Sequence, residues 1–168
     1  MKNLALWLSA TAPSVFIQEH NAWTIPVIQS IHILGIALVM GTVLMIDLSI
    51  LGWASRDQTA GETARRFGPW LTGSLCLMLV SGGLMVIGQP TRELMSLSFR
   101  LKMGLVAAGA VIAFLMVRAL SKRGLAAVDR TPGAKALAIA TFVGWVCIIV
   151  LGRLIAYDHV WGSWSPAG

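Results

Sequence analysis

Charged residues are scarce in this chain of 168 residues, where Asp, Glu, Lys and Arg together make up 12%. A soluble domain averages about 25%. Hydrophobic residues make up 57%, and the mean hydropathy is +0.77. This balance argues against a water-soluble domain and indicates a membrane protein. The net charge of +6 does not indicate a nucleic-acid partner, because the basic residues lie mostly between apolar runs rather than in one stripe.

Cysteine is scarce as well. Cys76 and Cys147 lie far apart inside apolar runs, and no CxxC spacing occurs. We therefore expect neither a disulfide nor a zinc site, and predict two buried structural thiols. A hydrolase or transferase constellation is also lacking, since no nucleophile and base are suitably spaced around His32. The sequence leaves open whether the chain is an enzyme.

What the sequence does contain is long uncharged runs. They predict four transmembrane helices at about residues 25–53, 68–89, 98–121 and 134–158, each long enough to cross a bilayer. The expected fold is an all-α polytopic membrane protein, with residues 1–168 forming one domain built as a four-helix bundle. Pro26 is expected in the first turn of its helix. Polar, turn-rich segments at 55–66, 89–93 and 121–133 are predicted to connect the helices.

Residues 1–22 are predicted to form an interfacial segment. Leu4, Trp7 and Leu8 have helical spacing before Pro13, and Ser14 is predicted to cap a second short turn. Both pieces are too short to span a membrane. The apolar stretch at 4–8 is also shorter than the core of a signal peptide, so we expect this segment to be retained.

Aromatic and basic residues predict how the helices sit in the membrane. Four tryptophans fall at predicted span ends, as an aromatic belt requires: Trp23, Trp53, Trp70 and Trp161. Trp145 falls mid-span and is expected inside the bundle. One side of the membrane receives eight basic residues, Arg56, Arg65, Arg66, Arg118, Lys122, Arg123, Arg130 and Lys135; the other receives five, Lys2, Arg92, Arg100, Lys102 and Arg153. This bias predicts a bacterial inner-membrane protein with the first group cytoplasmic and both termini periplasmic.

His32 is the one ionisable residue in the run 21–46. An ionisable side chain inside a membrane span usually has a partner or a function. His32 lies six residues past Pro26, about 9 Å along the helix. Depth counted in this way predicts one layer near the periplasmic face, formed by His32, Met85, Met103 and Arg153, with His20, Arg92 and His159 above it.

Such a layer is suited to a b-type haem. His32 is predicted to be one axial ligand, and Gly35, one turn later, to leave room for the flat macrocycle. Arg153 and Arg92 are expected to face the propionates. The second ligand is left open among His159, His20, Met85 and Met103.

Other interpretations of the same residues stay open. His32 could instead bond Gln29, a serine or a carbonyl across helices. Copper is the alternative cofactor, with a metal site at His32, His159 and His20 or a soft path along the methionines Met40, Met45, Met78 and Met85. Asp47 and Arg118 lie near the cytoplasmic ends of their helices, where we expect a structural ion pair or, alternatively, a proton relay.

Several phrases resemble an uncharacterised family of small four-helix bacterial inner-membrane proteins. They are Trp23-x-x-Pro26, Gln29-Ser30-x-His32-x-Leu34-Gly35, Asp47-Leu48-x-x-Leu51-Gly52, Pro90-x-Arg92-Glu93-Leu94 and Gly152-Arg153-x-Ile155-Ala156-Tyr157. The resemblance implies a four-helix membrane fold and assigns no activity. A histidine followed by Leu-Gly in the first span is also loosely similar to membrane domains of the copper-resistance D type and of b-type cytochromes.

The functional hypothesis is a haem b subunit that passes electrons between a periplasmic redox partner and quinone. The alternatives are a copper-handling protein or small-solute transporter, and a structural or assembly subunit. Membrane lipid is the expected surrounding. A chain of this size encloses little interior volume, so we also expect an oligomer or a complex with other membrane subunits.

Overall fold

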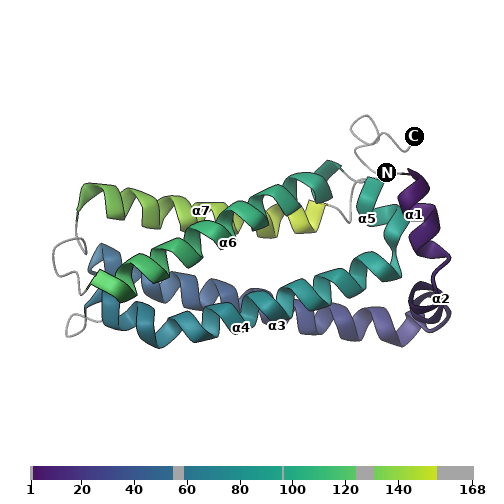
Figure 1. Cartoon of the computed structure of the whole chain (residues 1–168), viewed down its shortest axis with the longest axis horizontal. Coiled ribbons are helices and arrows are strands. Elements are labelled where there is room, and N and C mark those ends of the chain that lie inside the picture. The colour runs from purple at the N-terminus through teal and green to yellow at the C-terminus, as the bar shows by residue number, and fades with distance from the viewer. Residues whose placement is uncertain (1, 55–58, 96, 124–130, 155–168) are drawn as a thin grey trace.

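The computed structural model describes residues 2–54, 59–95, 97–123 and 131–154, and this part of the chain is helical apart from short connections. Four long helices lie side by side (Figure 1): α3 (Asn21–Leu51), α4 (Ala60–Gly88), α6 (Leu97–Arg123) and α7 (Pro132–Leu154). Three short helices, α1 (Lys2–Ser9), α2 (Ala12–Glu19) and α5 (Pro90–Met95), gather at one end. We call this the capped end, and the opposite end, where Arg65 and Arg118 lie, the basic end.

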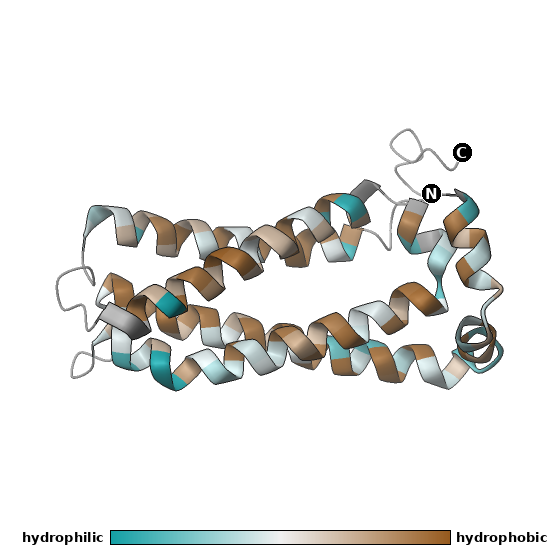
Figure 2. Ribbon diagram, in the orientation of Figure 1, coloured by the Kyte–Doolittle hydropathy of each residue, from teal (hydrophilic) through white to brown (hydrophobic). Residues whose placement is uncertain are grey.

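All four long helices are long and apolar enough to cross a membrane. Figure 2 shows hydrophobic residues along all four long helices. Large hydrophobic side chains among them are exposed, such as Leu79 at 73% and Leu34 at 63%. Water would penalise this surface, whereas lipid solvates it. The prediction of an all-α, multi-pass membrane protein is therefore confirmed. The prediction that both cysteines are buried is wrong: Cys76 and Cys147 are free and exposed, on faces that would meet lipid.

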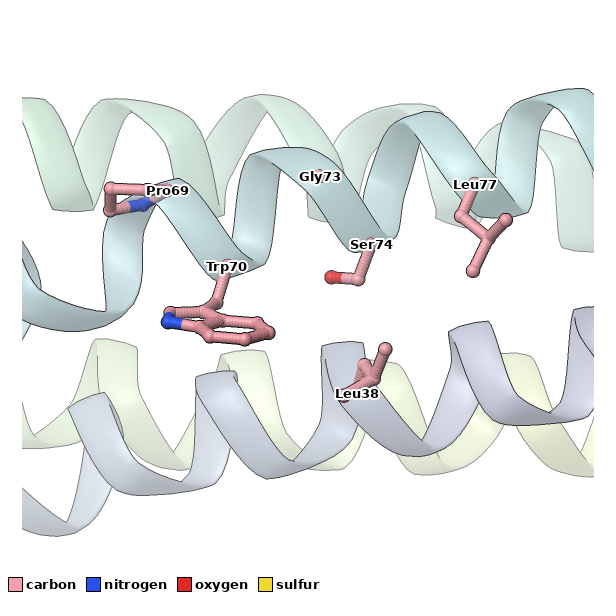
Figure 3. Close-up of a pocket in the computed structure, with 6 residues that line it drawn as sticks. All are labelled: Leu38, Pro69, Trp70, Gly73, Ser74 and Leu77. Atoms are coloured by element: carbon pink, nitrogen blue, oxygen red, sulfur yellow. The ribbon is translucent and has the colours of Figure 1, made fainter.

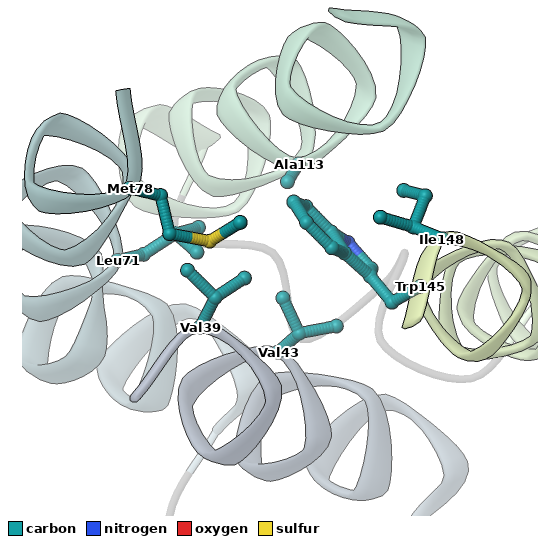
Figure 4. Close-up of a cluster of buried hydrophobic side chains, with 7 residues drawn as sticks. All are labelled: Val39, Val43, Leu71, Met78, Ala113, Trp145 and Ile148. Carbon is teal, nitrogen blue, oxygen red and sulfur yellow. The ribbon is translucent and has the colours of Figure 1, made fainter. Parts of the chain in front are cut away.

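The long helices form a ring in the order α3, α4, α6, α7, in which each packs against two neighbours. A cluster of buried side chains fills the middle of this ring (Figure 4): Val39, Val43, Leu71, Met78, Ala113, Trp145 and Ile148. Trp145 is 2% exposed, which confirms its predicted place inside the bundle. A second cluster, containing Ile46, Ile50 and Leu120, lies toward the basic end.

The short helices cover the capped end. The Ser14 hydroxyl of α2 donates a 2.6 Å hydrogen bond to the Ile87 carbonyl near the end of α4. Ser14 is therefore not the helix cap that we predicted; Thr11 occupies the N-cap position of α2. Gly88 permits the contact, because a Cβ there would lie 2.8 Å from Ile17. This end of the bundle is closed by packing between helices.

The helices extend further than predicted at three places. α4 begins at Ala60, inside the segment predicted as a turn, because Thr59 and Glu62 form a capping box. The segment 89–93 contributes to α5. α3 begins at Asn21, so Pro26 lies inside the helix rather than in its first turn. A proline so near the helix start removes only one backbone hydrogen bond.

Candidate functional site

His32 lies on the face of α3 that packs against α4, and it is 8% exposed. The two helices approach closely one turn away, where a Cβ on Gly35 would lie 3.1 Å from Met78 Cγ. A Cβ on Gly82 of α4 would lie 3.4 Å from His32 Cε1. Gly35 therefore lies at a close approach of the two helices, and Gly82 lies within van der Waals range of the imidazole.

Ser81 holds the His32 ring. The ring Nδ1 and the Ser81 hydroxyl oxygen are 2.8 Å apart. The same hydroxyl donates to the Leu77 carbonyl at 2.7 Å. Since a hydroxyl has one proton, Nδ1 must be the donor toward Ser81, which leaves Nε2 as the nitrogen with a free lone pair. No residue in the described part of the chain bonds this Nε2.

Lys102 brings a positive charge to the same region. Its ammonium lies within Coulombic range of His32 and of Glu93. The side chain is half-buried and reaches α7, where a Cβ on Gly152 would lie 3.2 Å from its Nζ. The region around His32 therefore receives a hydroxyl group from α4 and a positive charge from α6. Lys102 of α6 is a cation near His32 that was not selected from the sequence.

The other predicted site residues are more dispersed. Met85 lies four residues after Ser81, one turn along the same face of α4, and is half-buried. Met103 is 43% exposed on α6, and Arg153 is exposed in the last turn of α7. His159 and the side chain of Arg92 lie outside the described part.

His20 is not beside His32. It is exposed at the junction of α2 and α3, and its Nδ1 donates to the Phe16 carbonyl at 3.0 Å. Twelve helical residues, about 18 Å, separate it from His32. Within the described residues no three His, Cys, Asp or Glu side chains form a group that could hold a metal ion. His20 and His32 therefore do not share a metal site in this conformation.

The space at Gly35 is filled by protein. Met78 and Leu77 of α4 would contact a Cβ at that position, at 3.1 and 3.6 Å. Gly35 therefore serves the packing of α3 on α4, and the prediction that it leaves room for a macrocycle is wrong. Any flat cofactor ligated by His32 would have to extend from the ring toward another side.

Ser81 and Lys102 were not selected as site residues from the sequence. Ser81 is a polar residue deep in the uncharged run 67–91, and helix counting puts it at a depth similar to that of His32. From the sequence, Lys102 is counted among the basic residues of the periplasmic side and is given no role at the site. Depth could have suggested the pairing of Ser81 with His32, but the rotation of each helix was needed to decide it.

Asp47 forms a separate buried polar contact toward the basic end. Asp47 is 2% exposed, and the Thr141 hydroxyl of α7 lies 3.2 and 3.1 Å from its two carboxyl oxygens. Arg118 is exposed on α6. The predicted ion pair between Asp47 and Arg118 is therefore replaced by a contact between α3 and α7.

The Thr141→Val variant should be destabilised, because it leaves the buried Asp47 carboxyl group without its hydroxyl partner. We expect a loss of about 1–3 kcal/mol in the free energy of unfolding. Asp47→Leu combined with Thr141→Val should lose less than the sum of the single changes, as both polar groups are then gone. Apparent melting temperatures in detergent measure both effects. Thr72→Val is the control, since Thr72 is exposed and bonds only the Gly68 carbonyl of its own helix.

A groove of about 380 Å³ opens between α3 and α4 (Figure 3). It lies nearer the basic end than His32. Trp70 lies across it and the Ser74 hydroxyl faces it, with Leu38 on the opposite wall. Leu77 links the groove to His32. Its side chain lines the groove, and its carbonyl oxygen accepts a hydrogen bond from Ser81, which holds the His32 ring. None of the described residues that line this groove is charged.

Comparison with known proteins gives one match. Residues 20–158 match the model of a family described only as a family of unknown function, DUF6644. The matched range contains all four long helices and His32. No curated protein and no solved structure matches the chain. The resemblance to an uncharacterised family is thus confirmed, and the looser one to copper-resistance and cytochrome domains finds no support.

Proposed function

This chain belongs to a family of unknown function, DUF6644, and we propose that it is a haem b-binding electron-transfer subunit of the bacterial inner membrane. The observation that carries the proposal is the state of His32. An imidazole buried between membrane helices is held at Nδ1 by Ser81, and its Nε2 is left over. That is how a metal-ligating histidine is normally fixed, since the bond at one nitrogen orients the other toward the metal.

The residues around His32 fit a haem in their chemistry. An imidazole nitrogen is a common axial ligand of haem iron. Lys102, half-buried near His32, supplies a positive charge for a propionate, and Arg153 adds a second cation near the end of α7. Haem b supplies a one-electron carrier when bound. The protein's contribution is the orientation of His32 and the exclusion of water around it.

As a second residue that would hold the haem we propose Met85 or His159. Met85 is half-buried and shares the Ser81 face of α4, which is the face that meets His32. His20 is disfavoured by its exposure and by its bond to Phe16, and Met103 by its outward position. His159 lies just beyond the described end of α7 and stays a candidate from the sequence alone.

Quinone is the proposed membrane-soluble partner. The groove between α3 and α4 is apolar and open to the surface that would face lipid, and the broad face of Trp70 can stack on a planar ring (Figure 3). The redox partner is proposed to dock at the capped end. That end is assigned to the periplasm because basic residues concentrate at the opposite end.

An absorption spectrum of the purified full-length protein tests the proposal. Protein produced in cells supplied with a haem precursor should be red, with a Soret band, and the pyridine haemochrome assay should give haem b in stoichiometric amount. Measuring the iron and copper content of the same sample distinguishes a haem protein from the alternative, a copper-binding protein. Colourless protein without haem, or stoichiometric copper in place of iron, would show the proposal to be wrong.

Ser81→Ala should weaken haem binding about 10- to 100-fold, because the bond that orients the His32 ring is lost. Ser74→Ala is the matched control. Ser74 and Ser81 are both 3% exposed and lie on the same helix, but the Ser74 hydroxyl bonds only the Leu71 carbonyl of its own helix. Haem titration of the apoprotein measures both affinities. Equal affinity for the two variants would remove Ser81 from the site.

A further inference from the structure

A groove of about 540 Å³ lies between α4 and α6 at the basic end of the bundle. Arg65 of α4 and Arg118 of α6 both line it. Its remaining walls are mostly apolar and include Leu75 and Phe114, with Thr72 as a polar neighbour. Two positively charged side chains therefore lie at one end of this largely apolar groove, on the surface that would face lipid.

The packing of α4 on α6 creates this arrangement. The helices approach closely at Gly61, where a Cβ would lie 3.0 Å from the Leu120 carbonyl oxygen, and at Gly68, where a Cβ would lie 2.9 Å from Val117 Cγ1. α4 begins at the end of the bundle where α6 finishes, so Arg65 and Arg118 line the same groove although they are distant in the sequence. From Arg65 to Leu75 the helix rises about 15 Å, which takes the groove from the basic end into the apolar part of the span.

The two arginines keep their charge available. Among the described residues no carboxylate forms an ion pair with either guanidinium group. Glu62 is the acidic group near Arg65, and it already accepts bonds from the Thr59 backbone and hydroxyl groups at 2.9 and 3.1 Å. Arg66, next along the chain, lies over the Phe67 ring at 5.8 Å and does not line the groove.

We propose that this groove binds one anionic phospholipid of the surrounding bilayer. Arg65 and Arg118 bind the phosphate group, and an acyl chain lies along Leu75 and Phe114. Basic pockets between transmembrane helices on the cytoplasmic side recognise anionic headgroups in this way. The groove between α3 and α4 provides the contrast, because the described residues that line it include no cation to bind a phosphate. This site is independent of any haem at His32.

Native mass spectrometry of the delipidated full-length protein in detergent tests the site. Phosphatidylglycerol should bind saturably at one per chain, and phosphatidylcholine with the same acyl chains should bind much more weakly. Arg65→Gln and Arg118→Gln should each weaken phosphatidylglycerol binding roughly fivefold. Arg66→Gln is the matched control and should leave the affinity unchanged, because Arg66 is also exposed but does not line the groove.

Thr72→Trp tests the groove itself. Thr72 is exposed and lines the groove, so a tryptophan side chain there fills the groove while both arginines stay in place. Phosphatidylglycerol binding should fall as far as in the arginine variants. If the Thr72→Trp variant bound phosphatidylglycerol as tightly as the parent chain, the arginines would act only as surface charge. Equal loss in Arg66→Gln, or equal binding of phosphatidylcholine, would likewise overturn the proposed site.

Discussion

The His32→Ala variant is expected to purify as a folded but colourless protein, without the Soret band of the parent chain. Alanine removes the only histidine in the described part of the chain that lies between membrane helices. It also releases the Ser81 hydroxyl, which keeps its bond to the Leu77 carbonyl, so the packing of α3 on α4 loses little. The predicted effect is therefore on the cofactor and not on the fold.

His20→Ala is the matched control for this experiment. His20 is exposed and bonds a carbonyl one turn away, so its removal should leave the spectrum and haem content unchanged. Both variants are compared at equal protein concentration after size-exclusion chromatography, which reports whether each is folded. Full haem content in His32→Ala would exclude His32 as the ligand. Loss of haem in His20→Ala as well would point to a site at the capped end.

Trp145→Ala should have the largest effect on stability. Trp145 packs at the centre of the bundle against Val39, Val43 and Ile148, and it is 2% exposed (Figure 4). Truncating a buried aromatic side chain to alanine costs about 3–5 kcal/mol. For a chain of this length that lowers the melting temperature by roughly 10 °C. Heating in detergent followed by size-exclusion chromatography measures the change.

Two further tryptophan variants test whether the loss of stability comes from the burial of Trp145 rather than from the loss of any tryptophan. Trp145→Phe should be mild, because the indole nitrogen of Trp145 is buried without a hydrogen-bond partner and its loss breaks no bond. Trp70→Ala should also change the melting temperature little, since Trp70 is 64% exposed beside the α3/α4 groove. A melting temperature of Trp145→Ala equal to that of Trp70→Ala would contradict the observed core.

Helix positions were largely predictable because lipid imposes a simple rule. A segment that crosses the membrane must be apolar and must satisfy its backbone hydrogen bonds internally, so a long uncharged run indicates a helix. The errors fall where other interactions extend the helices. The Thr59–Glu62 capping box starts α4 at Ala60, eight residues before the predicted span at 68–89. The signal was present in the sequence, as a threonine followed three residues later by a glutamate.

The buried polar contacts were less predictable. Depth along a helix can be counted from the sequence, but the direction of each side chain depends on the rotation of its helix and on its neighbours. Asp47 was expected to meet Arg118 because both lie near the same membrane face, yet the rotation of α3 turns it toward Thr141 of α7. Cys76 and Cys147 were misplaced for the same reason, since both faces of a membrane helix are apolar.

By itself, the sequence determined that this protein is an all-α bundle crossing the membrane and that His32 is the unusual residue within it. Only the tertiary structure decided that Ser81 holds the ring and that Lys102 lies nearby. It also decided that Met78 and Leu77 occupy the space at Gly35. The physical reason is that hydropathy fixes which segments enter lipid, whereas contacts between helices depend on close packing at glycines, which hydropathy does not encode.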